Sequence, residues 1–178
     1  MRMQKSYDFS NNRIADLALL LAVAVILGYV EAVIPLSAGV PGIKLGLANC
    51  AILFVLYRYG AGEAALVSLL RTAIIALLFT NLSMLLYSLA GAICSILVMS
   101  ILKQRKLFSI YGTSMAGGVV HNMAQMLVAL LLLRVPGGYE WWFTSYLPLL
   151  MICGLPAGMI NAFFAGAILQ RMKRQKWD

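Results

Sequence analysis

The sequence predicts an all-α integral membrane protein, a single bundle of six transmembrane helices. Of its 178 residues, 62% are hydrophobic and only 11% are charged, whereas soluble globular proteins carry about 25% charged residues. A soluble domain of this length has too small a core to bury so much apolar surface. In addition, the basic residues gather at alternate connections between the apolar segments. We therefore expect one membrane domain over residues 1–178, in which 13–169 form the bundle.

The first predicted helix covers residues 13–34 and follows a polar, basic segment at 1–12 that we place in the cytoplasm. It is longer than the apolar core of a signal peptide, which has about 7–15 residues. It also carries Asp16 and Glu31, so we expect it to be retained in the mature protein. Pro35 ends this helix.

The second, third and fourth predicted helices cover residues 44–57, 63–80 and 82–102. The second is short, because a helix needs about 20 residues to cross a bilayer. We expect it to begin with backbone inside the protein, which a membrane tolerates only where that backbone is buried or lines a cavity. A minimal turn joins the third and fourth helices.

The fifth and sixth predicted helices cover residues 113–133 and 144–169, and a basic tail follows at 170–178. Pro148 and Pro156 predict a kink or an irregular start in the sixth helix. The loop between these two helices holds aromatic side chains, which either anchor in the membrane interface or cover an outward-facing pocket.

Most of the 14 lysines and arginines lie at alternate connections of this bundle. These residues are Arg2, Lys5, Arg13, Arg58, Lys103, Arg105, Lys106, Arg171, Lys173, Arg174 and Lys176. Because cytoplasmic loops of membrane proteins are rich in lysine and arginine, the distribution places both termini in the cytoplasm and requires an even number of helices. The net charge of +8 thus reflects membrane topology. We expect a protein of the plasma membrane that has no nucleic-acid partner.

Arg71 lies in the middle of the third predicted helix, within a run that is otherwise apolar. A guanidinium at membrane depth costs about 2.5 kcal/mol or more unless it faces a polar cavity or a partner. The polar side chains that can be placed near it are Glu31, Lys44, Asn49, His121, Asn122, Gln125 and Asn161. We therefore predict a polar pocket for an anionic ligand, in which Arg71 and Lys44 hold the negative charge. The predicted hydrogen-bonding residues are Asn49, His121, Asn122 and Gln125.

Two of these polar residues leave alternatives open. Glu31 either forms a buried structural ion pair with Lys44 or Arg71, or orients one of these cations toward the ligand. His121 follows Gly117 by one helical turn, and the missing side chain of this glycine leaves a gap for a ligand or for a neighbouring helix. The histidine accordingly either faces the ligand or is a hydrogen-bonded packing residue.

Small residues recur at four-residue spacing in the first and sixth predicted helices. They are Ala18 and Ala22, then Ala24, Gly28 and Ala32, and in the sixth helix Gly154, Gly158, Ala162 and Gly166. In membranes such residues let helix backbones approach closely. Each stripe serves either packing inside the bundle or docking of another membrane subunit.

Motifs for catalysis are missing from the sequence. It has no Walker motif, no glycine-rich dinucleotide fingerprint and no Ser/His/Asp arrangement. Its 6 acidic residues are scattered rather than paired for Mg²⁺. A single histidine, and 3 cysteines that all lie in apolar segments, give no metal-ligand spacing. We therefore expect a chain that is not an enzyme and holds no cofactor or metal.

The segment Val40–Phe54 (VPGIKLGLANCAILF), with His121, Asn122 and Gln125 downstream, resembles the Gx transporter family. Members of that family are labelled heptaprenyl diphosphate synthase component I, and they are similar to the substrate-binding S components of energy-coupling factor (ECF) transporters. The resemblance implies a compact six-helix, S-component-like bundle with both termini inside. It also implies a ligand near the outer face, in the region of Lys44.

The resemblance further implies partners and a mode of action. In S components an Ala-x-x-x-Ala motif of the first helix docks onto a transmembrane coupling subunit, and Ala18 and Ala22 match this motif. The ATPase subunits are separate proteins, which agrees with the missing Walker motif. We thus expect a substrate-binding subunit of an ECF-type uptake transporter for a small anionic or amphipathic molecule. A vitamin, a flavin, or an isoprenoid or quinone precursor fits this description.

Two other functions remain open at this point. The chain is alternatively a membrane accessory subunit of isoprenoid or quinone synthesis, or a membrane anchor of a flavin-based electron-transfer complex. An accessory subunit supports prenyl transfer, alone or with a soluble partner. An anchor holds no ligand and pairs its polar residues with one another.

Overall fold

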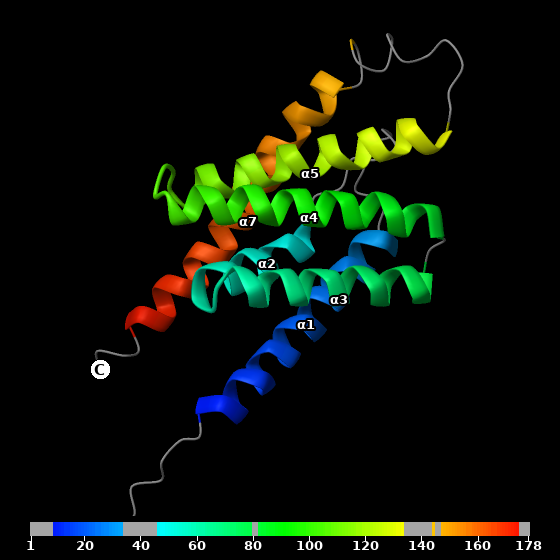
Figure 1. Ribbon diagram of the computed structural model, residues 1–178. Helices are drawn as coiled ribbons and strands as arrows, with labels where there is room; N and C mark the ends of the chain where they lie inside the picture. Colours follow the sequence, from blue (N-terminus) through cyan, green and yellow to red (C-terminus); the bar gives the residue numbers. More distant parts are fainter. Residues whose placement is uncertain (1–8, 34–45, 80–81, 134–143, 145–146, 175–178) are drawn as a thin grey trace, which may run out of the picture.

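The computed structural model describes residues 9–33, 46–79, 82–133, 144 and 147–174. The helices in this part of the chain are α1 (Phe9–Val33), α2 (Leu47–Arg58), α3 (Ala61–Phe79), α4 (Leu82–Gln104), α5 (Ile110–Leu133) and α7 (Leu147–Arg174). Each predicted transmembrane segment corresponds to one of them (Figure 1). No strand occurs among the described residues. The predicted all-α bundle is confirmed.

Helix length separates α2 from the other helices. α1, α3, α4, α5 and α7 are long and apolar enough to cross a membrane. α2 has 12 residues and therefore rises about 18 Å, well short of a hydrocarbon core of about 30 Å. The predicted short second helix is present, although it begins at Leu47 rather than at 44. The protein is a multi-pass membrane protein.

Two helices extend beyond their predicted ends. α1 begins at Phe9 rather than at 13, and α7 continues to Arg174 rather than stopping at 169. An apolar run marks the part of a helix that lies in lipid, but backbone hydrogen bonding continues through the polar residues beyond it. α7 begins at Leu147 and includes Pro156. Its start leaves Pro148 in the first turn, where a missing backbone N–H costs no helical hydrogen bond.

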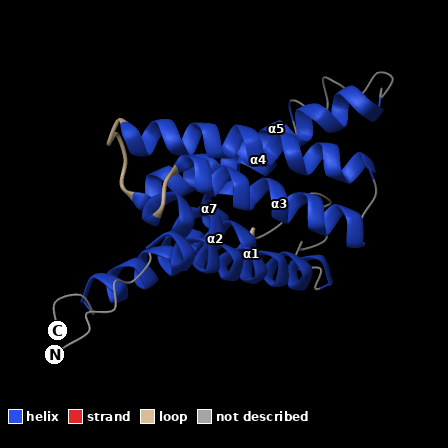
Figure 2. Ribbon diagram, turned by 60° about the horizontal axis from the view of Figure 1, so that its bottom comes forward, coloured by secondary structure: helices blue, strands red, loops and turns tan. Residues whose placement is uncertain are grey.

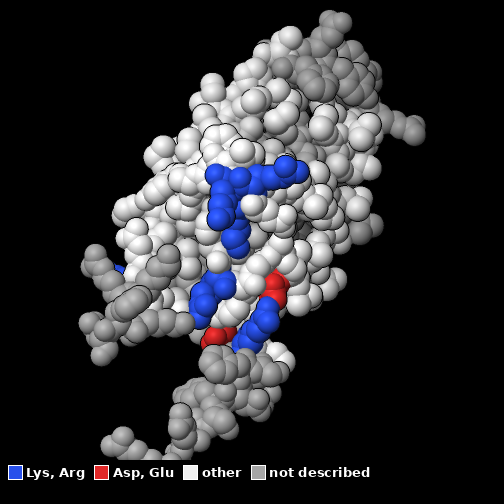
Figure 3. All heavy atoms as spheres, turned by 60° about the vertical axis from the view of Figure 1, so that its left-hand side comes forward, with Lys and Arg blue, Asp and Glu red and all other residues white. Residues whose placement is uncertain are grey.

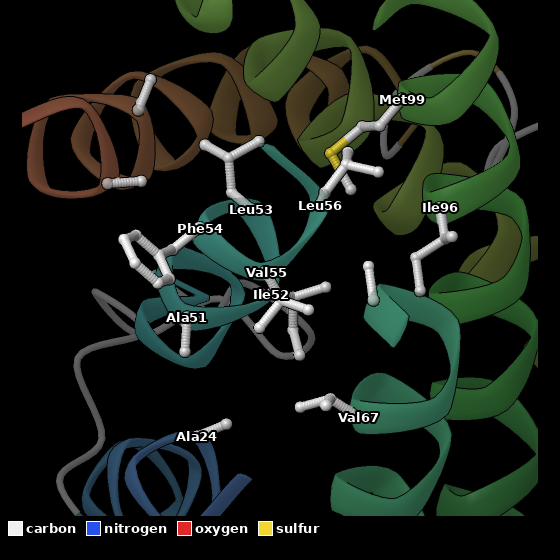
Figure 4. Close-up of a cluster of buried hydrophobic side chains, with 13 residues drawn as sticks. Ala24, Ala51, Ile52, Leu53, Phe54, Val55, Leu56, Val67, Ile96 and Met99 are labelled. Atoms are coloured by element: carbon white, nitrogen blue, oxygen red, sulfur yellow. The ribbon is translucent and has the colours of Figure 1, made fainter. Parts of the chain in front are cut away.

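α2 lies at the centre of the bundle. It packs against α1, α3 and α7, while α5 packs against α4 and α7 (Figure 1). Every residue from Ala51 to Leu56 is buried. Side chains of the other helices surround this segment, among them Ala24 of α1, Val67 of α3 and Met99 of α4 (Figure 4). A helix that is apolar on all sides needs such complete surroundings.

The outward surfaces of the helices are apolar. Leu77 of α3 is 83% exposed and Leu131 of α5 is 74% exposed. Exposing so much apolar surface to water is unfavourable, whereas lipid tails solvate it. The bundle therefore presents a surface suited to the bilayer interior.

The start of α1 and the end of α7 lie at the same end of the bundle, together with the α2–α3 turn and the α4–α5 loop (Figures 1 and 2). The exposed residue Arg58 ends α2 beside the first of these connections, and the exposed residues Arg105 and Lys106 lie in the second. Figure 3 shows lysines and arginines gathered on this side of the molecule. We call it the basic end. This grouping follows the predicted charge pattern, and its cytoplasmic orientation stays a prediction.

Polar contacts at the basic end fasten α1 to the α2–α3 turn. Arg13 of α1 forms an ion pair with Glu63 of α3. The Tyr59 hydroxyl donates a hydrogen bond of 2.8 Å to the Asp16 carboxylate. Partial burial and, after it, this hydrogen bond raise the pKa of Tyr59 above its ordinary value of 10.0. The tyrosine is therefore neutral at physiological pH, and its hydroxyl remains the donor of this hydrogen bond.

Glycines bring α5 and α7 into close contact. A Cβ atom on Gly154 would lie 2.8 Å from the backbone nitrogen of Val119, and one on Gly158 would lie 2.5 Å from the Cα of Met115. Ala162, one turn further along α7, is fully buried. This part of the small-residue stripe therefore serves packing inside the bundle.

Candidate functional site

The start of α2 is a polar point inside the bundle. Gly46, directly before α2, has φ 67° and ψ 31°, a left-handed conformation that glycine adopts without steric cost. Its backbone N–H donates a hydrogen bond to the Glu31 carboxylate of α1. Because a helix N-terminus carries partial positive charge, Glu31 contacts α2 where a carboxylate is favoured.

Arg71 of α3 reaches the same point. Its Nη1 donates a hydrogen bond of 3.3 Å to Oδ1 of Asn49, in the first turn of α2. Burial opposes the positive charge of Arg71, and the Glu31 carboxylate stabilises it. The Nε atom is enclosed and has no hydrogen-bond partner among the described residues. In this part of the chain, Arg71 thus keeps one directed donor unused.

Asn161 of α7 completes the group. Its side chain is only 3% exposed, and its Oδ1 has no hydrogen-bond partner within the described ranges. A Cβ atom on Gly46 would lie 3.6 Å from Nδ2 of Asn161 and 3.0 Å from Nδ2 of Asn49. Both amides therefore lie against this glycine. We define the Gly46 cluster as Glu31, Gly46, Asn49, Arg71 and Asn161.

The Gly46 cluster lies near the middle depth of the bundle. At 1.5 Å per residue, Arg71 is about 15 Å along α3 from Ala61, and Asn49 is about 14 Å along α2 from Arg58. Ala61 and Arg58 flank the α2–α3 turn at the basic end. Since a hydrocarbon core is about 30 Å thick, the interior start of α2 and the intramembrane arginine share one level.

His121 and Gln125 of α5 lie against α4. A Cβ atom on Gly91 would lie 2.9 Å from Cε1 of His121 and 2.8 Å from Cγ of Gln125. The gap beside Gly117 is filled by the Met99 side chain of α4. Of the two alternatives for this gap, the neighbouring helix is the one that the structure shows.

The three polar residues of α5 do not share one environment. His121 contacts α4 at Gly91, which lies at a depth similar to that of Arg71, because both are about 12–14 Å along their helices from the α3–α4 connection. Asn122 instead donates from Nδ2 to the Leu150 carbonyl oxygen of α7 at 3.0 Å. The Asn122 amide therefore fastens α5 to α7.

Comparison with known proteins assigns the chain to a family. A family model described as heptaprenyl diphosphate synthase component I matches residues 20–168. The chain belongs to the heptaprenyl diphosphate synthase component I family. The match confirms the resemblance seen in the sequence, and its range contains the whole Gly46 cluster. No curated protein and no solved structure matches the chain.

In this member of the heptaprenyl diphosphate synthase component I family, the two small-residue stripes of α1 face different surroundings. Ala24 is fully buried, and Gly28 packs against Ile75 of α3. Ala18 and Ala22 are exposed. One stripe therefore packs inside the bundle, and the other lies on its outer surface.

The chemistry of the Gly46 cluster is that of a binding site. It combines a guanidinium, a carboxylate, two carboxamides and the backbone N–H of Gly46. Within the described residues, no group of three or more histidine, cysteine, aspartate or glutamate side chains is placed to hold a metal ion. The predicted site residue Lys44 lies outside the described residues.

The sequence analysis assigned no role to two members of this cluster. Gly46 acts through its backbone N–H and its left-handed conformation. The signal for it was a glycine directly before the short apolar helix. Asn161 was placed near Arg71 without a function, and its signal was a single amide among small apolar residues of the last helix.

Proposed function

We propose that this protein is the membrane-embedded, substrate-binding subunit of an ECF-type uptake transporter for a small anionic or amphipathic molecule. The Gly46 cluster carries the proposal. Its Arg71 guanidinium lies at middle depth and keeps the Nε donor unused in the described part of the chain. A charged side chain at this depth is costly. An anionic ligand that binds the Arg71 guanidinium explains why a charged residue occupies this position.

The cluster suits a ligand with a carboxylate or phosphate group. Arg71 offers planar donors that match such groups. Asn49 holds the guanidinium in place, and Asn161 adds a buried acceptor for an O–H or N–H elsewhere on the ligand. We propose that Lys44 contributes a second positive charge from the preceding segment.

The polar residues of α5 extend this proposal to the other side of α4. We propose that His121 and Gln125 bind a further part of the ligand, since they lie at a depth similar to that of the Gly46 cluster. Asn122 has one amide hydrogen bond to α7. It is proposed to fix α5 so that the neighbouring histidine keeps its orientation.

The exposed pair Ala18 and Ala22 supports docking through α1. Small side chains let a second membrane helix approach closely. We propose that the loaded subunit docks there onto a transmembrane coupling subunit and reorients with it to release the ligand inside. ATP hydrolysis is assigned to separate subunits. The basic end faces the cytoplasm of the cell in this proposal, in line with its exposed lysines and arginines.

The family description favours one alternative, an accessory subunit in isoprenoid synthesis. An accessory role predicts that a soluble prenyl-transfer partner gains activity or membrane attachment from this chain. It does not require a small molecule in the Gly46 cluster. Ligand content therefore separates the two functions.

The test is mass spectrometry of small molecules that co-purify with the detergent-solubilised protein. Arg71→Ala is compared with the wild type, and Arg58→Ala, which removes an exposed arginine at the basic end, is the matched control. The proposal expects a stoichiometric acidic compound in the wild type and in Arg58→Ala that is lost in Arg71→Ala. Bulk lipid alone in all three samples contradicts it and favours the accessory role.

A further inference from the structure

The Glu31 carboxylate occupies the position at the start of α2 that an acidic ligand needs. It accepts the hydrogen bond of the Gly46 N–H, and its charge interacts with that of Arg71. Helix N-termini and guanidinium groups are the usual partners of ligand carboxylates and phosphates. We propose that Glu31 is an intramolecular occupant of an anion site, and that the acidic group of the ligand binds by displacing it.

This inference rests on the proposed function and deepens it. It names the chemical group of the ligand that enters the Gly46 cluster, a carboxylate or phosphate. It also names Glu31 as the residue that sets the affinity for this group. From the sequence, Glu31 is either a structural partner or an orienting residue, and competition with the ligand is a third role.

Two atoms show that the site offers more than Glu31 uses. The Nε of Arg71 and the Oδ1 of Asn161 are both enclosed, and neither has a hydrogen-bond partner among the described residues. Asn161 is 3% exposed, and its Nδ2 lies against Gly46. Burying polar atoms without partners is unfavourable. A ligand whose acidic group accepts from Arg71 Nε and the Gly46 N–H, and whose own O–H or N–H donates to Asn161 Oδ1, makes contacts that the Glu31 side chain does not make.

Charge balance explains why displacement is preferred over binding beside Glu31. With Glu31 in place, Arg71 and Glu31 cancel each other in formal charge. A ligand anion that binds beside Glu31 would share Arg71 with this carboxylate, and the two like charges would repel each other even where Lys44 adds a positive charge. If Glu31 leaves, the incoming anion takes over both Arg71 and the start of α2.

The position of Glu31 near the end of α1 allows its side chain to move away from Gly46. α1 ends at Val33, two residues beyond Glu31, and the Glu31 side chain is only partly buried. A rotation of its side chain about Cα–Cβ moves the carboxylate away from the Gly46 N–H and toward the end of α1. The backbone of α1 stays in place during this exchange.

Sulfate binding to the full-length protein in detergent tests the proposal. Thermal unfolding is followed while sodium sulfate replaces sodium chloride at constant ionic strength, and the rise of the midpoint gives an apparent Kd. The variants are Glu31→Gln, which keeps an acceptor for the Gly46 N–H but removes the charge, and Glu31→Gln combined with Arg71→Met. Glu63→Gln removes an equal charge at the basic end and is the matched control.

The proposal expects Glu31→Gln to bind sulfate at least tenfold more tightly than the wild type. Glu63→Gln should match the wild type, and the double variant should lose saturable binding. Glu31→Asp keeps the charge but retracts the carboxylate by one methylene, so it should bind with intermediate affinity and serves if Glu31→Gln does not fold. Sulfate binding no tighter in either variant than in the wild type overturns the proposal, as does an equal, non-saturable effect in every protein.

This result is independent of the co-purification experiment. If Glu31→Gln binds sulfate more tightly but no compound co-purifies with the wild type, the displacement of Glu31 is supported and the transport function is contradicted. If an acidic compound co-purifies with the wild type but sulfate affinity is unchanged in Glu31→Gln and Glu31→Asp, the transport function is supported and the competition by Glu31 is contradicted.

Discussion

The Nη1 of Arg71 and the Oδ1 of Asn49 lie 3.3 Å apart and join the middle of α3 to the first turn of α2. α2 is too short to cross a bilayer, and Ala48 and every residue from Ala51 to Leu56 are buried among the other helices. Asn49 is therefore held on the most enclosed helix of the bundle. This contact fixes a flexible arginine side chain at the depth where the Gly46 cluster lies.

Asn49→Ala should weaken binding of the co-purified ligand about tenfold, because Arg71 loses the partner that orients it and a hydrogen bond to a charged group is worth about 1.5–3 kcal/mol. Isothermal titration in detergent measures the affinity. Gln170→Ala is the matched control, since it removes an exposed carboxamide of α7 outside the site. Equal losses of affinity in both variants would show that Asn49 has no special part in binding.

Gly158→Ala should lower the free energy of unfolding by about 1–3 kcal/mol, as expected for overpacking at a close helix contact. Its Cβ atom would lie 2.5 Å from Met115 Cα, so α5 and α7 must separate. In contrast, a Cβ on Gly166 of the same helix meets nothing within 4 Å. Gly166→Ala should leave stability unchanged or raise it by up to about 1 kcal/mol. Thermal unfolding of both variants checks this contrast, and similar destabilisation by both would argue against the close contact.

The Tyr59–Asp16 hydrogen bond should make stability fall at alkaline pH. The pKa of Tyr59 is raised above 10.0 in the folded protein, so its contribution is complete below the unfolded pKa and is lost as pH rises through the folded pKa. The difference in unfolding midpoint between the wild type and Tyr59→Phe should therefore shrink as pH rises above 10.0. A difference that stays constant or grows would mean that the hydroxyl is not the donor.

Ala18→Leu together with Ala22→Leu should abolish co-purification with the coupling subunit while leaving ligand content unchanged. The larger side chains keep a second helix from approaching the exposed face of α1. Ala167→Leu, at an exposed position of α7, is the control and should retain the partner. Affinity purification of the co-expressed proteins decides between these results, and an intact complex in the double variant would place docking elsewhere.

The helices of this fold could be predicted from the sequence, because apolar runs of sufficient length are enough to locate them. The ends of α1 and α7 could not, since the polar residues at both continue the helix beyond the lipid. The central position of α2 in the bundle could not be predicted from the sequence either. In a membrane helix nearly every side is apolar, so the sequence pattern does not indicate which side contacts protein and which contacts lipid.

The candidate site could be predicted in part. Glu31, Asn49 and Arg71 come together as expected, because charged and amide side chains in an apolar environment need one another. The hydrogen bond from Asn122 to the ligand stays a prediction. The Asn122 amide donates to a backbone carbonyl oxygen of α7, a partner that side-chain spacing does not reveal. The part played by Gly46 is likewise a backbone effect, since it depends on an N–H group that every residue except proline carries.

The central claim is that Arg71 serves to bind a ligand rather than to stabilise the fold. Thermal unfolding of the wild type and of Arg71→Ala, each before and after removal of the co-purified compound by extended washing in detergent, tests it most directly. The account predicts that washing lowers the wild-type midpoint, whereas the midpoint of Arg71→Ala does not change on washing. The account is contradicted if washing changes neither midpoint and the midpoint of Arg71→Ala lies well below that of the washed wild type. Arg71 would then be a structural residue.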